Sequence, residues 1–208
     1  ILSFSQAASN FTGSVDDKWS TAGNWSAGIP IATTKVTLLK SVTLDVDATI
    51  KQLKTSSSSD ASVVVTGETG KTLTITATGV GQPIQIGGTG ITLDLSAVTV
   101  AMTPGDGTEA LAINGAGSNL TLGTFSSDQH TNFFGQAGVA NPRTFTLNGP
   151  YTSAKWIQFK SNSTIVFGEN YDPTGHTNQM RFLDSGQGAA RVTVQGTSWL
   201  KEGLKIIS

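Results

Sequence analysis

The chain consists largely of short segments in which apolar and polar residues alternate, separated by Gly, Asn and Ser. TLTITATG, GITLDLSAVTV, NLTLGTF and RVTVQG are typical examples. A period of two residues indicates half-buried β-strands, and no stretch of a dozen residues keeps a helical period. The sequence therefore predicts an all-β fold. The segments expected to be strands are 36–38, 42–46, 50–53, 63–65, 73–75, 84–86, 91–95, 98–100, 111–113, 120–122, 145–147, 157–159, 165–167, 180–182, 192–194 and 204–206.

Two all-β architectures compete for this pattern. A β-sandwich uses a limited number of strands of roughly five to eight residues, and the segments here are shorter and more numerous. In a β-solenoid each coil contributes two or three short strands, and parallel coils stack about 4.8 Å apart with ladders of apolar residues inside. We therefore expect a right-handed parallel β-helix (β-solenoid) of roughly seven to nine coils with an N-terminal cap. A β-sandwich is the alternative.

The chain divides into a cap and a set of coils. Residues 1–35 are predicted to form an N-terminal strand and a Trp-rich cap, with Trp19 and Trp25 covering the first layer of the core. Residues 36–208 are predicted to form the coils. The stretches 123–144 and 168–179 lack alternation, so they are expected to leave the coil as longer loops, where binding residues usually lie.

The opening residues carry a resemblance to a known family. A Trp, then Asn-Trp, then Gly and Pro precede the first strand, as Trp19, Asn24, Trp25, Gly28 and Pro30. This pattern resembles the N-terminal cap of bacterial autotransporter-type and related surface-protein parallel β-helices. The resemblance covers about 60 residues, and it departs from the family where Thr-Thr-Lys replaces an acidic residue before the first strand. Such modules occur in adhesins, matrix proteins, polysaccharide-active enzymes and some phage fibres, so the resemblance implies a fold more than a function.

The composition argues against nucleic-acid and membrane partners. The net charge is −1 and no basic cluster is present, so we expect no nucleic-acid partner. No run approaches the roughly 18 apolar residues of a membrane helix, which argues against membrane insertion. Cysteine is absent, so stability must come from the core rather than from disulfides.

No motif predicts catalysis, a metal or a cofactor. Neither histidine lies in a catalytic signature, and the two are too far apart to indicate a zinc site. Asp45 and Asp47 share a strand face, as a calcium site could require, but outward acids on strands are usually solvated. A polysaccharide lyase is the one enzyme class considered, with Tyr171, His176 and Arg181 near one loop; ordinary packing of these loop residues is the simpler interpretation.

The two predicted loops supply the candidate ligand-binding residues. Flat apolar rings complement the CH face of a sugar, and charged or polar neighbours can fix its orientation. A Phe pair that buries itself as a lid over the coil is the alternative. The candidates are His130, Phe133, Phe134, Tyr171 and His176.

Together these features predict a non-enzymatic, extracellular structural or adhesive module of a bacterial surface or matrix. Its main partner would be copies of itself, because a solenoid ends in unpaired strand edges that can recruit another chain. The residues expected to support end-to-end assembly into filaments are Leu2, Phe4, Leu204, Ile206 and Ile207. The alternatives are a carbohydrate-binding or polysaccharide-degrading β-helix, with glycans as partners, and a phage or virus fibre segment.

Overall fold

A computed structural model describes residues 8–77, 79–103, 108–135, 143–160, 163–183, 194–195 and 206–207. The described residues form three parallel sheets and no α-helix, with one short 3₁₀ turn, η1 (Ala22–Asn24). Sheet 1 contains β1 (Ala8–Phe11), β2 (Lys35–Leu38), β5 (Gln52–Thr55), β8 (Ile84–Ile86), β11 (Thr108–Ile113), β14 (His130–Gly135), β17 (Ile157–Lys160), β19 (Met180–Leu183) and β21 (Ile206–Ile207).

The other two sheets complete each coil. Sheet 2 contains β3 (Val42–Leu44), β6 (Ser62–Gly67), β9 (Thr92–Leu95), β12 (Asn119–Leu122), β15 (Arg143–Leu147), β18 (Ser163–Phe167) and β20 (Val194–Gln195). Sheet 3 contains β4 (Ala48–Ile50), β7 (Thr72–Ile75), β10 (Thr99–Met102), β13 (Phe125–Ser127) and β16 (Tyr151–Thr152).

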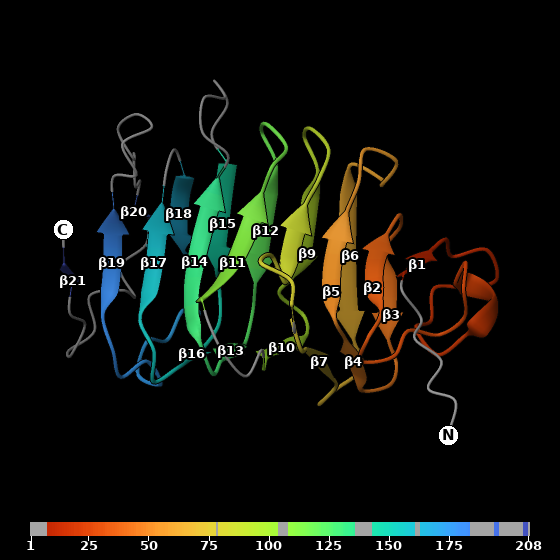
Figure 1. Cartoon of the computed structure of the whole chain (residues 1–208), viewed down its shortest axis with the longest axis horizontal. Helices are drawn as coiled ribbons and strands as arrows, with labels where there is room; N and C mark the ends of the chain where they lie inside the picture. Colours follow the sequence, from red (N-terminus) through yellow and green to blue (C-terminus); the bar gives the residue numbers. More distant parts are fainter. Residues whose placement is uncertain are drawn as a thin grey trace.

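The chain is a parallel β-solenoid of about 6 turns. Successive strands of one sheet come from successive coils, and they lie side by side along the long axis in Figure 1, with the cap at one end and β21 at the other. All strand pairs between described strands are parallel, which excludes the β-sandwich. This number of turns is lower than the seven to nine expected from the sequence. The right-handed sense of the winding stays a prediction.

The core consists of ladders of inward residues, one from each coil. In sheet 1 the ladder changes along the axis from aliphatic side chains to aromatic ones. Phe133 and Phe159 have ring centroids 5.0 Å apart, and the next ring, that of Phe182, stacks 5.3 Å from Phe159. Stacked rings bury large apolar areas and add an aromatic contact at each step. The fully buried members of this ladder are Val36, Leu53, Ile84, Leu111, Phe133 and Phe159.

Glycines occupy corners where one coil passes directly over the next. A Cβ on Gly115 would overlap the carbonyl oxygen of Gly88 in the preceding coil. Gly149 likewise lies against the backbone of Gly123. The backbones can approach this closely only without side chains, which explains the glycine-rich corners seen in the sequence.

The segment 123–144 corrects one prediction. It contains β13, β14 and the start of β15, so the chain continues the coil through the region expected to be one long loop; residues 136–142 lie outside the described part. The alternation was missed because the inward Phe125 and Phe133 are separated by a turn, and because Phe133 is followed by a second Phe that breaks the period of two. The second predicted loop, 168–179, contains no described strand and is joined to the coil by two isolated bridges.

The cap closes the first edges of sheets 1 and 2. On the outer side of β1, Thr12 N donates to Asn24 O (2.8 Å) and Ser26 N donates to Asn10 O (3.0 Å). On the outer side of β3, the backbone of Thr43 bonds to Asp17 O and receives the N–H of Trp19. Chain segments before β2 therefore satisfy strand edges that would otherwise be open.

Three aromatic rings of the cap seal the end of the core. Trp19 and Trp25 lie edge to face at 4.8 Å, and Phe11 contacts Trp25 at 5.0 Å. Trp25 Nε1 donates to the carbonyl oxygen of Trp19 (2.8 Å), so its one polar atom is satisfied inside the core. Both Trp side chains are at most 5% exposed.

The remaining predicted cap residues shape the loop around these rings. Asn24 is fully buried, and its Oδ1 accepts from the N–H groups of Val15 (2.9 Å) and Asp16 (3.1 Å). Gly28 adopts a left-handed φ of 84°, where glycine costs least, and Pro30 is buried. The Trp…Asn-Trp…Gly-x-Pro pattern is therefore a set of structural positions.

Candidate functional site

The structure separates the residues that the sequence proposed for ligand binding. Phe133 is a fully buried member of the sheet 1 ladder, and Tyr171 is 1% exposed against Phe167, with ring centroids 4.7 Å apart. Neither ring is accessible to a sugar, so their proposed stacking role is wrong. The buried-lid alternative was closer, although Phe133 forms the core itself. Phe134 pairs with Lys160 and Ala112 in sheet 1.

Tyr171 also cannot serve as a lyase base. Burial, together with neighbouring Tyr151 and Asp172, raises the pKa of its hydroxyl far above the usual range. A base must release its proton near the working pH and must touch the substrate. The buried hydroxyl of Tyr171 meets neither requirement.

His176 has a structural environment on the sheet 3 side of the coil. Its Nε2 lies 2.9 Å from the carbonyl oxygen of Lys155 and must carry the proton, since a carbonyl only accepts. Its backbone forms an isolated parallel bridge with Ser153, and its ring meets Tyr151 edge to face at 5.1 Å. Burial lowers the pKa of His176, which keeps the ring neutral.

His130 belongs to a row of stacked side chains on the outside of the coils. Its ring stacks on Trp156 at 4.1 Å, and its Nδ1 accepts the backbone N–H of Trp156 (3.3 Å). The guanidinium of Arg181, held by Gln179 Oε1, lies 5.1 Å from the indole centroid. Burial, and then the charges of Lys155 and Arg181, lower the pKa of His130.

This row places Trp156 between its neighbours. His130, Trp156 and Arg181 come from successive coils, since Thr131, Ile157 and Met180 are paired in order. Neighbouring coils therefore cover the indole from both sides, and it offers no free ring face to a ligand. The row was missed because its members are separated by some 25 residues in sequence.

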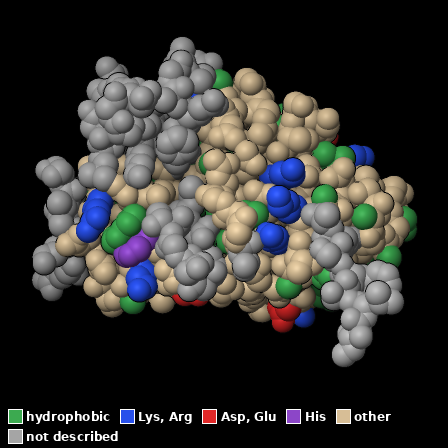
Figure 2. Space-filling view, in the orientation of Figure 1, with side chains coloured by type: hydrophobic (Ala, Val, Ile, Leu, Met, Phe, Trp, Pro, Cys, Tyr) green, Lys and Arg blue, Asp and Glu red, His purple; other side chains and the backbone are tan. Residues whose placement is uncertain are grey.

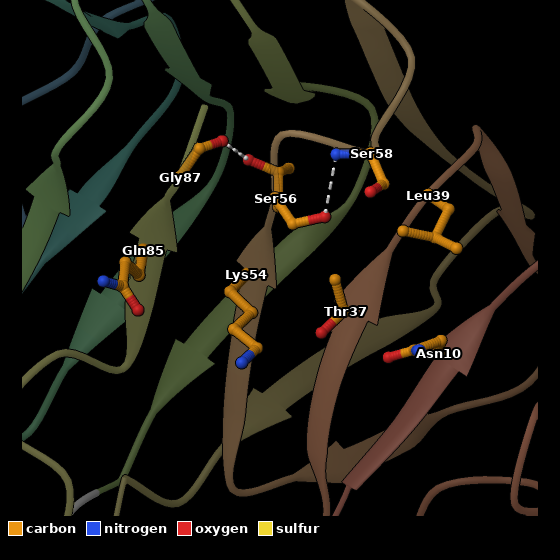
Figure 3. A pocket seen from close by; sticks show the side chains of 9 residues that line it. Asn10, Thr37, Leu39, Lys54, Ser56, Ser58, Gln85 and Gly87 are labelled. Atoms are coloured by element: carbon orange, nitrogen blue, oxygen red, sulfur yellow. Dashed lines mark hydrogen bonds between the residues drawn. The ribbon is translucent and has the colours of Figure 1, made fainter. Parts of the chain in front are cut away.

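A polar groove lies on the outer face of sheet 1. It has a volume of about 430 Å³. Its floor comes from four neighbouring strands, β1, β2, β5 and β8, and the turn after β5 forms its wall (Figure 3). The residues lining it are Asn10, Thr37, Leu39, Lys54, Thr55, Ser56, Ser58, Gln85 and Gly87.

The register of the strands explains the floor of the groove. Asn10 pairs with Thr37, Thr37 with Lys54, and Lys54 with Gln85, so the four side chains form one outward row. Adjacent strands are about 4.8 Å apart, and the row therefore extends about 14 Å. None of these four side chains forms a hydrogen bond or ion pair with another described residue. Asn10 is exposed and Lys54 and Gln85 are partly exposed, so their polar atoms are available to a ligand, whereas Thr37 is only 6% exposed.

The wall of the groove is fixed by its own hydrogen bonds. Ser59 Oγ donates to Leu38 O (2.6 Å), and Ser58 N donates to Ser56 Oγ (3.2 Å). Thr55 Oγ1 donates to Gly87 O (3.1 Å), which ties the wall to the next coil. The serine run SSSSD therefore forms an ordered turn beside the groove, although its composition resembles that of a flexible linker.

The described residues show no arrangement for a metal ion. No group of three His, Asp or Glu side chains converges in this part of the chain. Asp45 accepts from Ser20 N and Ser20 Oγ, and Asp47 accepts from Thr72 N, so each carboxylate is used in local structure. No helix in the described ranges is long and apolar enough to cross a membrane.

The fold defines the class of protein as a parallel β-solenoid with an N-terminal cap. Comparisons with protein-family models, with curated proteins and with solved structures give no match to this chain. The structure supports the resemblance to surface-protein β-helices as far as the solenoid fold, and no match supports the narrower family assignment.

Proposed function

We propose that this protein is a non-enzymatic, extracellular structural or adhesive β-solenoid of a bacterial surface or matrix, related to autotransporter-type surface modules. The observation that carries the proposal is the continuity of the inner ladders. The sheet 1 ladder runs from Val36 to Phe159 with every member fully buried. A core without interruption, bounded by hydrogen-bonded parallel strands, makes a stiff body that resists local opening.

Self-association end to end is the sharper form of this proposal. Within the described residues, the exposed large hydrophobic side chains all belong to the cap and the first coil: Val15 is 66% exposed, Ile29 41%, Ile31 46% and Val46 37%. A soluble surface that gathers its exposed apolar side chains at one end has the character of an interaction site. The cap end is thus the contact surface that we propose for a second copy.

The cap determines which kind of contact two copies can form. The outer edge of β1 is already occupied by residues 24–26, so a neighbour cannot add a strand there. We therefore propose side-chain contacts with the cap rather than strand addition to β1. At the other end of the sheet, Ile206 and Ile207 form β21, which pairs with β19. Leu2, Phe4 and Leu204 lie outside the described residues.

Sedimentation velocity and electron microscopy test this proposal with one variant and its matched control. Ile31→Asp places a charge in the apolar end and should weaken self-association at least tenfold, with filaments shortened or lost. Thr89→Asp adds the same charge on an exposed loop and should leave association unchanged. A wild-type chain that stays monomeric at all concentrations would contradict end-to-end assembly.

A further inference from the structure

The charges of the molecule are distributed unevenly. The chain as a whole has 13 Lys and Arg against 14 Asp and Glu. The strands of sheet 1 nevertheless contain Lys35, Lys54, Lys160 and Arg181 and a single acidic residue, Glu109. The strands of sheet 3 contain no charged residue. Figure 2 shows Lys and Arg side chains on the face of sheet 1, with Asp and Glu visible only along its lower margin.

The polar groove lies within this basic face. Lys54 stands at the centre of its floor, with Thr37 on one side and Gln85 on the other (Figure 3). Lys54 has no carboxylate partner among the described residues, so its ammonium group is available to an anion. Lys51 precedes the same strand, and Lys35 starts the neighbouring one, which extends the positive potential beyond the groove.

The uncharged groups of the groove match a polyhydroxylated ligand. Asn10 and Gln85 each offer an amide with two donors and an acceptor. These groups project from strands of a rigid scaffold rather than from a flexible loop, so little ordering is needed on binding. The volume of about 430 Å³ lies in the range typical of sites for small ligands.

We propose that this groove binds an acidic polysaccharide, with Lys54 pairing with a carboxylate or sulfate and the amides of Asn10 and Gln85 hydrogen-bonding sugar hydroxyls. This inference assigns a ligand class to the adhesive part of the proposed function and rests on it. It also moves the glycan site away from the loops indicated by the sequence, to a face that exists only after the coils have stacked.

Nucleic acid fits the same face less well. Proteins that bind single strands combine a basic groove with aromatic side chains on which bases stack. The residues lining the groove include no aromatic ring, and the indole of Trp156 is covered by His130 and Arg181. A sugar needs hydrogen-bonding groups and one charge partner, and the groove provides these.

Biolayer interferometry on the full chain provides the test. The probes are polygalacturonate for carboxylated sugars, dextran sulfate for sulfated sugars, neutral dextran, poly-L-glutamate as a carboxylated polymer without sugar, and single-stranded DNA. One or both acidic glycans should bind at least tenfold more tightly than each of the three other polymers, and the acidic probe that binds identifies the preferred anion.

Three variants locate the binding. Lys54→Gln should weaken acidic-glycan binding about tenfold, since a charge-assisted hydrogen bond is lost. Lys71→Gln removes the same charge at similar exposure beside sheet 3 and should change affinity less than twofold. Gln85→Ala should weaken glycan binding while leaving any binding of poly-L-glutamate unchanged, because it removes a hydroxyl partner and no charge.

The outcomes that overturn the inference are specific. Equal losses in Lys54→Gln and Lys71→Gln would mean general attraction to polyanions, and tighter binding of DNA would assign the face to nucleic acid. No binding of either acidic glycan by a chain that still self-associates would remove this inference and leave the proposed structural function standing. Release of unsaturated sugars from polygalacturonate would instead contradict the non-enzymatic part of that function.

Discussion

Asn24 is the residue on which the conformation of the cap most depends, and its replacement by Ala should open the cap before the coils. Its Oδ1 accepts the N–H groups of Val15 and Asp16, and its Nδ2 donates to Asp16 Oδ1 (2.6 Å) and Lys18 O (2.9 Å). The side chain is 0% exposed, so water cannot replace it without movement of the loop.

The expected cost follows from these bonds. Each donor left without a partner costs about 1–3 kcal/mol when buried. Val15 and Asp16 lie in an exposed loop, so water can bond to their N–H groups once the cap opens. Each of these two groups therefore contributes a cost near the lower end of this range. We therefore expect Asn24→Ala to lower the local free energy of opening of the cap by about 2–4 kcal/mol. Asn170→Ala, at an exposed position outside the cap, is the control and should have little effect.

Asn24→Asp provides a second test, because the stability of this variant should depend on pH. The backbone N–H of Lys18, and then Asn24, hold the pKa of Asp16 below its ordinary value. A second carboxylate in place of the amide would oppose Asp16 at short range, so at pH 7 this variant should be less stable than Asn24→Ala. As the pH falls toward 4, one of the two carboxyl groups takes up a proton and can donate again, and the order should reverse.

Hydrogen exchange of the amides in residues 12–26, read by mass spectrometry, measures the local opening directly, and the fluorescence of Trp19 and Trp25 reports the same event. A change in cap exchange of less than about 1 kcal/mol in Asn24→Ala, which is the cost of one such hydrogen bond, would contradict the proposed role of Asn24. An equal rise of exchange in β17 and in the cap would also contradict it, because the hydrogen bonds of Asn24 reach no later coil.

Three further predictions concern the coils. Phe159→Ala removes a buried ring from the aromatic ladder and should cost about 3–5 kcal/mol in urea unfolding followed by circular dichroism, against less than about 0.5 kcal/mol for the outward Thr164→Ala. Gly115→Ala should cost at least about 2 kcal/mol or prevent soluble expression, because its Cβ meets backbone of the preceding coil, whereas Gly81→Ala, with nothing within 4 Å, should be tolerated. Burial depresses the pKa of His176 in the folded state, so as the pH drops below about 6.5 the unfolded chain takes up a proton more readily than the folded one. The melting temperature should therefore fall with the pH in this range. A His176→Gln variant whose melting temperature depended on pH as strongly as that of the wild type would contradict the assignment to His176.

The strands of each coil can largely be predicted from local sequence. Strands with alternating residues such as Leu73 and Ile75 appear where the pattern placed them, since a period of two leaves one face to bury whatever the neighbours are. The cap was equally local, because Trp19 packs against Trp25 and Asn24 bonds to residues 15–18, all within a short stretch of chain. β13 and β14 escaped prediction because Phe125 stands among polar residues and Phe133 is followed by a second Phe, so neither short stretch shows a period of two.

The arrangement of side chains on the surface depends on how the coils stack. Asn10, Thr37, Lys54 and Gln85 extend over 75 residues of sequence, and the winding brings them into one row. The length of each connection sets which residue faces which in the next coil, and no local pattern encodes that register. Burial was decided in the same way: Phe133 and Tyr171 belong to the core because the coils close around them, which a list of aromatic residues cannot reveal.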